Sequence, residues 1–136
     1  MATLVIQTES TPLTVNLPAI EPMTEQQFYE FCQANRDLRI ERTAKGEVIV
    51  MLPTFSDTGN RNFNIGAQLW TWTEQDGTGL GFDSNSGFTL PNGAIRSPDA
   101  SWIKLERWNA LTEEQKASFA PIFPDFVIEL CSTVIC

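Results

Sequence analysis

The chain has 136 residues, the size of one ordinary domain, and 42% of them are hydrophobic. Charged residues make up only 19%, so the composition favours a packed core and argues against disorder. With 9 basic and 17 acidic side chains the net charge is −8, which disfavours binding that relies on clustered cations alone. The absence of histidine excludes a Ser-His-Asp triad, a histidine-bearing zinc site and a histidine general base.

Cysteine spacing and hydropathy exclude two further classes. The cysteines Cys32, Cys131 and Cys136 include no CxxC pair, which excludes a four-cysteine zinc site. No apolar run approaches the roughly 20 residues that a membrane span needs. The first ten residues lack the basic and apolar segments of a signal peptide. We therefore expect a cytoplasmic protein that does not use a membrane.

The N-terminal part divides into an arm over residues 1–22 and the start of a single domain over residues 23–136. Short apolar runs within the arm allow two interpretations, edge strands or a segment lying over the domain. A helix is predicted over residues 25–34, because Thr24 and Gln27 have the spacing of a capping box.

Next comes a predicted hairpin, in which residues 38–42 and 47–52 flank a turn at Gly46. A longer helix is predicted over residues 57–74. It carries two apolar stripes on nearly opposite sides, Phe63, Ala67 and Trp70 on one and Ile65, Leu69 and Trp72 on the other. Two apolar faces predict a helix buried between layers. Core packing is also the expected role of all four tryptophans, because a stacking platform for bases needs interleaved cations.

The second half of the chain favours strands. Residues 80–90 alternate with a period of two around a polar middle that bulges or turns, and residues 94–103 are predicted as the returning strand. Pro98 indicates that this strand is distorted or lies near a sheet edge. A second capping box at Thr112 predicts a short helix to about Phe119, and a last strand is predicted over Phe126–Cys131.

Two acidic residues fall inside these predicted strands, Asp99 in the run 95–103 and Glu129 in the apolar run 126–131. A carboxylate within a buried strand is unfavourable unless it is paired or binds a cation. If the two strands are neighbours, a divalent metal would offset the repulsion between the two carboxylates. Oxygen ligands of this kind suit Mg²⁺ or Mn²⁺. The alternative is that each carboxylate faces solvent on the open side of the sheet.

Two blocks of sequence, residues 86–102 and 123–132, resemble the Uma-two endonuclease family, long catalogued as a domain of unknown function. The resemblance implies an α+β fold with a PD-(D/E)xK restriction-endonuclease-like core, in which a central helix packs on a mainly antiparallel sheet. It implies that Asp99 and Glu129 are catalytic acids that bind Mg²⁺ or Mn²⁺, with Glu41 as a further metal-binding acid. The implied substrate is DNA, and the implied reaction is metal-assisted phosphodiester hydrolysis.

The chain also departs from the family pattern. Cys131 stands where the motif's lysine would be, and neither Lys45 nor Lys104 is a convincing replacement. The family normally continues beyond Ser132 with a helix and a final strand, so we expect a truncated and catalytically impaired member. An exposed sheet edge then predicts a homodimer or a poorly soluble product. The alternative function is a non-catalytic protein-interaction module or nuclease remnant.

Overall fold

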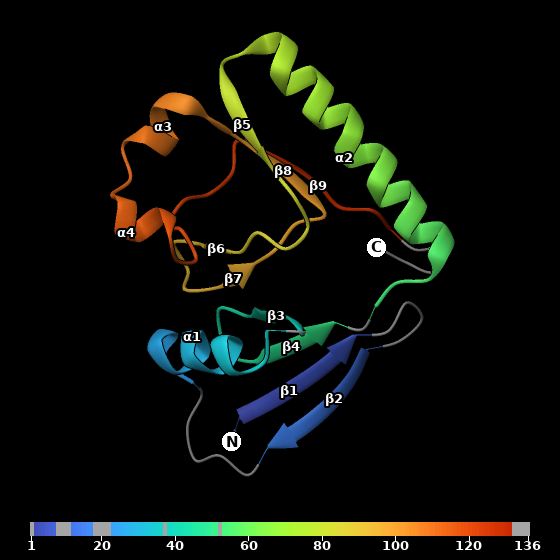
Figure 1. Cartoon of the computed structure of the whole chain (residues 1–136). Helices are drawn as coiled ribbons and strands as arrows, with labels where there is room; N and C mark the ends of the chain where they lie inside the picture. Colours follow the sequence, from blue (N-terminus) through green and yellow to red (C-terminus); the bar gives the residue numbers. More distant parts are fainter. Residues whose placement is uncertain (1, 8–11, 18–22, 37, 52, 132–136) are drawn as a thin grey trace.

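The structure is a computed structural model that describes residues 2–7, 12–17, 23–36, 38–51 and 53–131 (Figure 1). Its larger sheet has six strands in the order β2 (Pro12–Leu17), β1 (Ala2–Gln7), β4 (Val48–Met51), β3 (Arg39–Arg42), β7 (Ile95–Arg96) and β6 (Phe88–Thr89). Its smaller sheet has the order β5 (Gly79–Phe82), β8 (Ala100–Lys104) and β9 (Phe126–Ile128). The helices are α1 (Glu25–Ala34), α2 (Ser56–Asp76), α3 (Leu105–Asn109) and α4 (Glu113–Lys116).

Strand pairing is antiparallel throughout these two sheets except between β1 and β4, which run parallel. The described residues of the expected arm therefore form strands that extend the larger sheet. This agrees with the interpretation of the arm as strands and not as a segment lying over the domain. Together with the four helices, this arrangement confirms the predicted α+β class. No helix in the described stretches is long and apolar enough to cross a bilayer.

Helix α1 has the predicted bounds, and its capping box is present. The Thr24 hydroxyl accepts a hydrogen bond from the Gln27 backbone N–H at 3.2 Å, and the Gln27 side chain accepts one from the Thr24 N–H at 3.0 Å. The fully buried Phe28 anchors the helix on the larger sheet, where it packs with Ile40, Val48, Val50 and Ile95. The predicted hairpin is β3 and β4, with Ile40 opposite Val50.

Helix α2 forms as predicted, but the expectation that it is buried between layers is wrong. Its Leu69 packs with Ala100 and Trp102 of β8, so one face covers the smaller sheet. Phe63 and Trp70, on the other face, are 75% and 64% exposed. The assignment of all four tryptophans to the core is therefore wrong for Trp70 and also for Trp72, which is 49% exposed. An apolar stripe shows that a helix face avoids water, but it does not show that a second layer of the same chain covers that face.

The two long strands predicted in the second half are each divided between the two sheets. The first breaks at Asp83, whose carboxylate accepts hydrogen bonds from the Asn85 N–H at 3.0 Å and the Ser86 hydroxyl at 3.1 Å and so closes a turn. The second breaks at Pro98, which has no N–H to donate to a ladder, and this break separates β7 from β8. Asp99 therefore lies just before a strand, not inside one.

The last strand is shorter and more exposed than predicted. It ends at Ile128, so Glu129 follows the strand, and Phe126 and Val127 are exposed on β9, the edge of the smaller sheet. Alternating or apolar sequence alone does not distinguish an edge strand from a central one, because that depends on which neighbours the tertiary fold supplies.

Candidate metal centre

The register between β8 and β9 brings Asp99 and Glu129 to the same end of the smaller sheet. Ala100 lies opposite Ile128 in an antiparallel pair, so the residue before Ala100 lies beside the residue after Ile128. Asp99 Oδ2 also accepts a hydrogen bond from the Leu130 backbone N–H at 2.6 Å. The side chain of Asp99 is 12% exposed, so its carboxylate is held at this position and largely shielded from solvent.

The electrostatics of Glu129 reflect the acids around it. Although its residue is exposed, partial desolvation raises the pKa of its carboxyl, and the negative charges of Asp99 and Glu41 raise it further. The Arg39 guanidinium and the Asp99 backbone N–H lower this pKa, but the net direction is upward. The charges of Asp99 and Glu41 therefore act on Glu129, and a bound cation would offset this repulsion.

Glu41 is buried on β3, and each of its two oxygens already has a partner. Oε1 accepts a hydrogen bond from the Ser97 backbone N–H at 2.9 Å, and Oε2 accepts one from Arg96 at 3.1 Å. A charge buried in this way is stabilised by its partners, as polar groups in protein interiors require. The position of Glu41 is thereby fixed against the segment that leads to Asp99.

Arg39 lies two residues before Glu41, and therefore on the same face of β3. Its guanidinium donates to the Ser97 backbone carbonyl, and its Nη1 lies 3.5 Å from Asp99 Oδ1. Arg39 and Glu41 thus bind the carbonyl and the N–H of Ser97, and together they hold the Ser97–Asp99 segment against the larger sheet. The prediction from sequence missed Arg39, although its spacing from Glu41 was a usable signal.

The residues at this position suit a two-carboxylate metal site. Asp99 and Glu129 offer hard oxygen ligands, and Mg²⁺ commonly binds one or two carboxylates and completes its shell with water and phosphate. In the described stretches, no three histidine, cysteine, aspartate or glutamate side chains are grouped closely enough to hold a metal by themselves. Glu41 contributes negative charge, and both of its oxygens, like those of Asp99, already have protein donors.

No lysine among the described contacts reaches these acids. Lys45 and Lys104 are exposed, and the Lys116 ammonium pairs with Glu113 at 3.0 Å. The cation that contacts Asp99 is Arg39. Arg39, from another strand, therefore places a positive charge beside Asp99.

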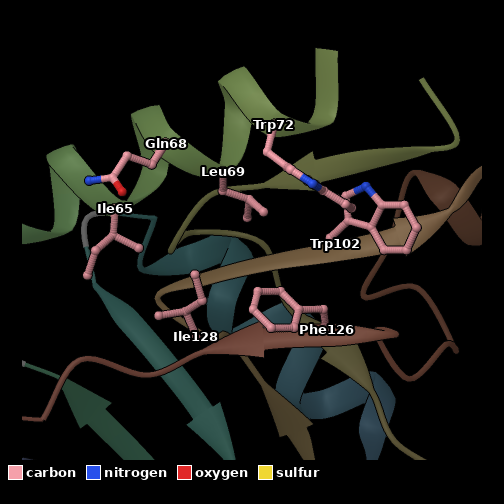
Figure 2. Close-up of a pocket in the computed structure, with 7 residues that line it drawn as sticks. All are labelled: Ile65, Gln68, Leu69, Trp72, Trp102, Phe126 and Ile128. Atoms are coloured by element: carbon pink, nitrogen blue, oxygen red, sulfur yellow. The ribbon is translucent and has the colours of Figure 1, made fainter. Parts of the chain in front are cut away.

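Two hollows flank α2. One is an apolar groove of about 580 Å³. Figure 2 shows its apolar lining side chains, which come from α2 (Ile65, Leu69, Trp72), β8 (Trp102) and β9 (Phe126, Ile128). A second cleft, of about 650 Å³, lies between α2 and β5, and Asp99 is part of its lining. Asp99 therefore borders a cleft of ligand size.

Helices and a mainly antiparallel sheet, with paired acids at adjoining strand ends, are the features of a restriction-endonuclease-like α+β fold. The Uma2 family model, described as a putative restriction endonuclease, matches residues 25–134. The chain belongs to this family. The match includes Glu41, Asp99 and Glu129 and leaves β1 and β2 outside. A search of curated proteins found no match.

Proposed function

We propose that this chain is a metal-dependent DNA endonuclease in which Asp99 and Glu129 bind Mg²⁺ or Mn²⁺. Family membership supports a nuclease-like function. The observation that carries the proposal is the pairing of β8 with β9, which sets the two acids side by side with Asp99 held by the Leu130 N–H. Glu41 is proposed as the third acid of the centre, with its charge acting on Glu129.

The proposed reaction is hydrolysis of a phosphodiester, in which water adds across a P–O bond and the leaving oxygen takes up a proton. A divalent ion would lower the pKa of a bound water and offset charge on the phosphate. The chain's own contribution is to orient the ligands, because Leu130 and Arg39 both fix the Asp99 carboxylate. Arg39 also supplies positive charge beside the site. Because no described lysine contacts these acids, we expect slow turnover.

The test combines metal binding with DNA cleavage. Calorimetric titration with Mn²⁺ is expected to show one binding event that Asp99→Asn and Glu129→Gln each weaken at least tenfold, and both variants should lose cleavage of plasmid DNA. Glu106→Gln removes one exposed carboxylate from α3 and serves as the matched control. Metal binding without cleavage would identify a nuclease remnant, and unchanged Mn²⁺ affinity in both variants would refute the proposed centre.

A second candidate function is a non-catalytic interaction module that acts through a homodimer. The observation in its favour is the apolar groove of Figure 2, which continues onto the exposed edge strand β9. An edge strand with unpaired backbone groups beside exposed apolar side chains can pair with a second copy. Cleavage activity distinguishes the two functions, since an interaction module needs neither Asp99 nor Glu129.

A further inference from the structure

The cleft that contains Asp99 has two walls of different origin. One wall is the face of α2 that carries Phe63, Gly66 and Trp70, and the other is formed by Phe82 of β5 and the turn that follows it. Its volume of about 650 Å³ lies in the range of small-molecule sites. The cleft is distinct from the groove of Figure 2, which lies between α2 and β9.

Exposed aromatic side chains lie on the α2 wall of this cleft. Phe63 and Trp70 lie two helical turns apart on one face of α2 and are largely exposed. Across the cleft, Phe82 is half-buried, and its ring packs with Phe88 at 5.4 Å and with Trp108 at 5.0 Å between ring centroids, so it supports the opposite wall. Large aromatics left uncovered around a cleft are characteristic of a binding surface.

Gly66 is a second, independent feature of the same wall. It lies in the middle of a 21-residue helix, where glycine is less favourable than alanine. A Cβ built at Gly66 meets no atom of the described chain within 4 Å, so internal packing gives no reason for a glycine there. Close approach of a ligand to the helix backbone is a reason that remains.

We infer that this cleft binds an unpaired nucleotide of the DNA strand whose phosphate lies at Asp99, so that the substrate class is single-stranded or locally unpaired DNA. Bases of any sequence stack on aromatic side chains, but only when they are released from the duplex stack. The cleft lining contains Asp83 and Asp99 and no basic residue, so a divalent cation has to offset the charge of the strand. This inference rests on the proposed nuclease function.

The experiment measures the affinity of the full chain for a fluorescent single-stranded oligonucleotide and for its duplex, with Ca²⁺ present and with EDTA. Single-stranded DNA is expected to bind at least ten times more tightly than duplex, and only with Ca²⁺. Trp70→Ala should weaken this binding about tenfold through lost stacking. Gly66→Leu should weaken it at least as much by filling the cleft, and its Tm should not fall, because leucine is the better helix former.

Asn64→Leu is the matched control, since it places the same side chain on an exposed position of α2 that lies outside the cleft lining. It should leave DNA affinity unchanged. Equal affinity for the two forms of DNA, or wild-type affinity in Gly66→Leu, would overturn the inference. The inference would also be overturned if Gly66→Leu converted a dimer of this chain into a monomer, because the cleft would then bind a second copy of the chain. If the chain binds single-stranded DNA but does not cleave DNA, the inference stands and the proposed function is refuted. If the chain cleaves DNA and Gly66→Leu does not change that cleavage, the proposed function stands and the inference is refuted.

Discussion

At the scale of single residues, Glu41 and Arg39 show how a site can depend on side chains that are not its ligands. Both bind Ser97, and the chain then reaches Asp99 within two residues. Because Pro98 cannot donate a ladder hydrogen bond, this segment is not held by strand pairing. Side chains from β3 replace the missing backbone contacts.

The first prediction concerns Glu41. Glu41→Ala removes the partner of Arg96 and leaves the buried Ser97 N–H without an acceptor, so we expect a loss of about 2 kcal/mol in the free energy of unfolding. Glu41→Gln retains an oxygen for Ser97 and should lose about half as much. Urea unfolding monitored by tryptophan fluorescence measures both, with exposed Glu74→Ala as the control. A loss below 0.5 kcal/mol (about the effect of a neutral surface change) would contradict this role.

The second prediction concerns pH. The pKa of Glu129 is raised in the folded protein above its ordinary value of 4.5, so the folded state holds this proton more tightly than the unfolded chain. The resulting stabilisation is present below pH 4.5 and is lost as the pH rises through the higher, folded-state pKa. Glu129→Gln should therefore have a higher Tm than wild type at neutral pH, with the difference shrinking in acid. Because a metal competes with this proton, Mn²⁺ affinity should rise over the same pH window in wild type and not in Glu129→Gln. A pH-independent difference in Tm would contradict this interpretation.

Asp99 and Glu129 were singled out in the sequence because each was expected inside a buried strand, and the structure corrects that expectation. Both were expected inside buried strands, and both lie at strand ends instead. Their selection therefore depends on the resemblance of residues 86–102 and 123–132 to the family, because the burial of carboxylates in strands left the solvent-facing alternative open. Arg39 was missed because its two-residue spacing from Glu41, which places both on one face of β3, was not used.

At the scale of elements, the packing of β5 on β8 depends on a glycine. A Cβ at Gly79 would lie 2.3 Å from the Trp102 ring and 2.5 Å from the Ile103 carbonyl oxygen, whereas a Cβ at Gly81 has its nearest neighbour at 3.6 Å. Trp102 is buried and contacts Trp72 edge to face at 5.4 Å, so it has little freedom to move. Gly79 therefore sets the distance between the two strands.

This contrast gives the third prediction. Gly79→Ala should destabilise the fold by about 2–3 kcal/mol through overpacking, while Gly81→Ala in the same strand should stay within about 0.5 kcal/mol of wild type. Urea unfolding of the two variants side by side measures the difference. Equal stabilities would show that the strands can separate to admit a methyl group, against the close packing described above.

The elements that were predicted correctly carry local signals. Helix α1 and the start of α4 follow from capping boxes, which are read within four residues. Helix α3 was not predicted, because its five residues lack a side-chain cap. The strands on either side of Pro98 were merged, because which sheet a strand joins depends on partners far away in the sequence.

At the scale of the whole molecule, the two sheets leave apolar surface on both sides of α2 and along β9. Phe126 and Val127 are exposed beside the groove that also contains Trp72 and Trp102. Apolar surface of this kind at an unpaired strand edge favours self-association. In the larger sheet β4 is not an edge strand, because it pairs with β1 on one side and with β3 on the other.

The fourth prediction follows from this edge. If β9 forms the dimer interface, Val127→Lys should convert a dimer into a monomer in size-exclusion chromatography with light scattering, because charged edge residues prevent strand pairing. Leu105→Lys, which changes a similarly exposed side chain on α3, should leave the mass unchanged. A wild-type protein that is monomeric at every concentration would rule out this interface.

By itself the sequence determined the bounds of α1 and the existence of α2, because capping and periodicity are local properties, and its resemblance to the family implied the α+β class and the two proposed ligands. Only the tertiary structure decided that Asp99 lies beside Glu129, that Arg39 and Glu41 hold the segment between β7 and β8, and that one face of α2 stays uncovered. These features depend on strand register and on which sheet each strand joins. Both are set by contacts between residues remote in sequence, for which no short segment carries a signal.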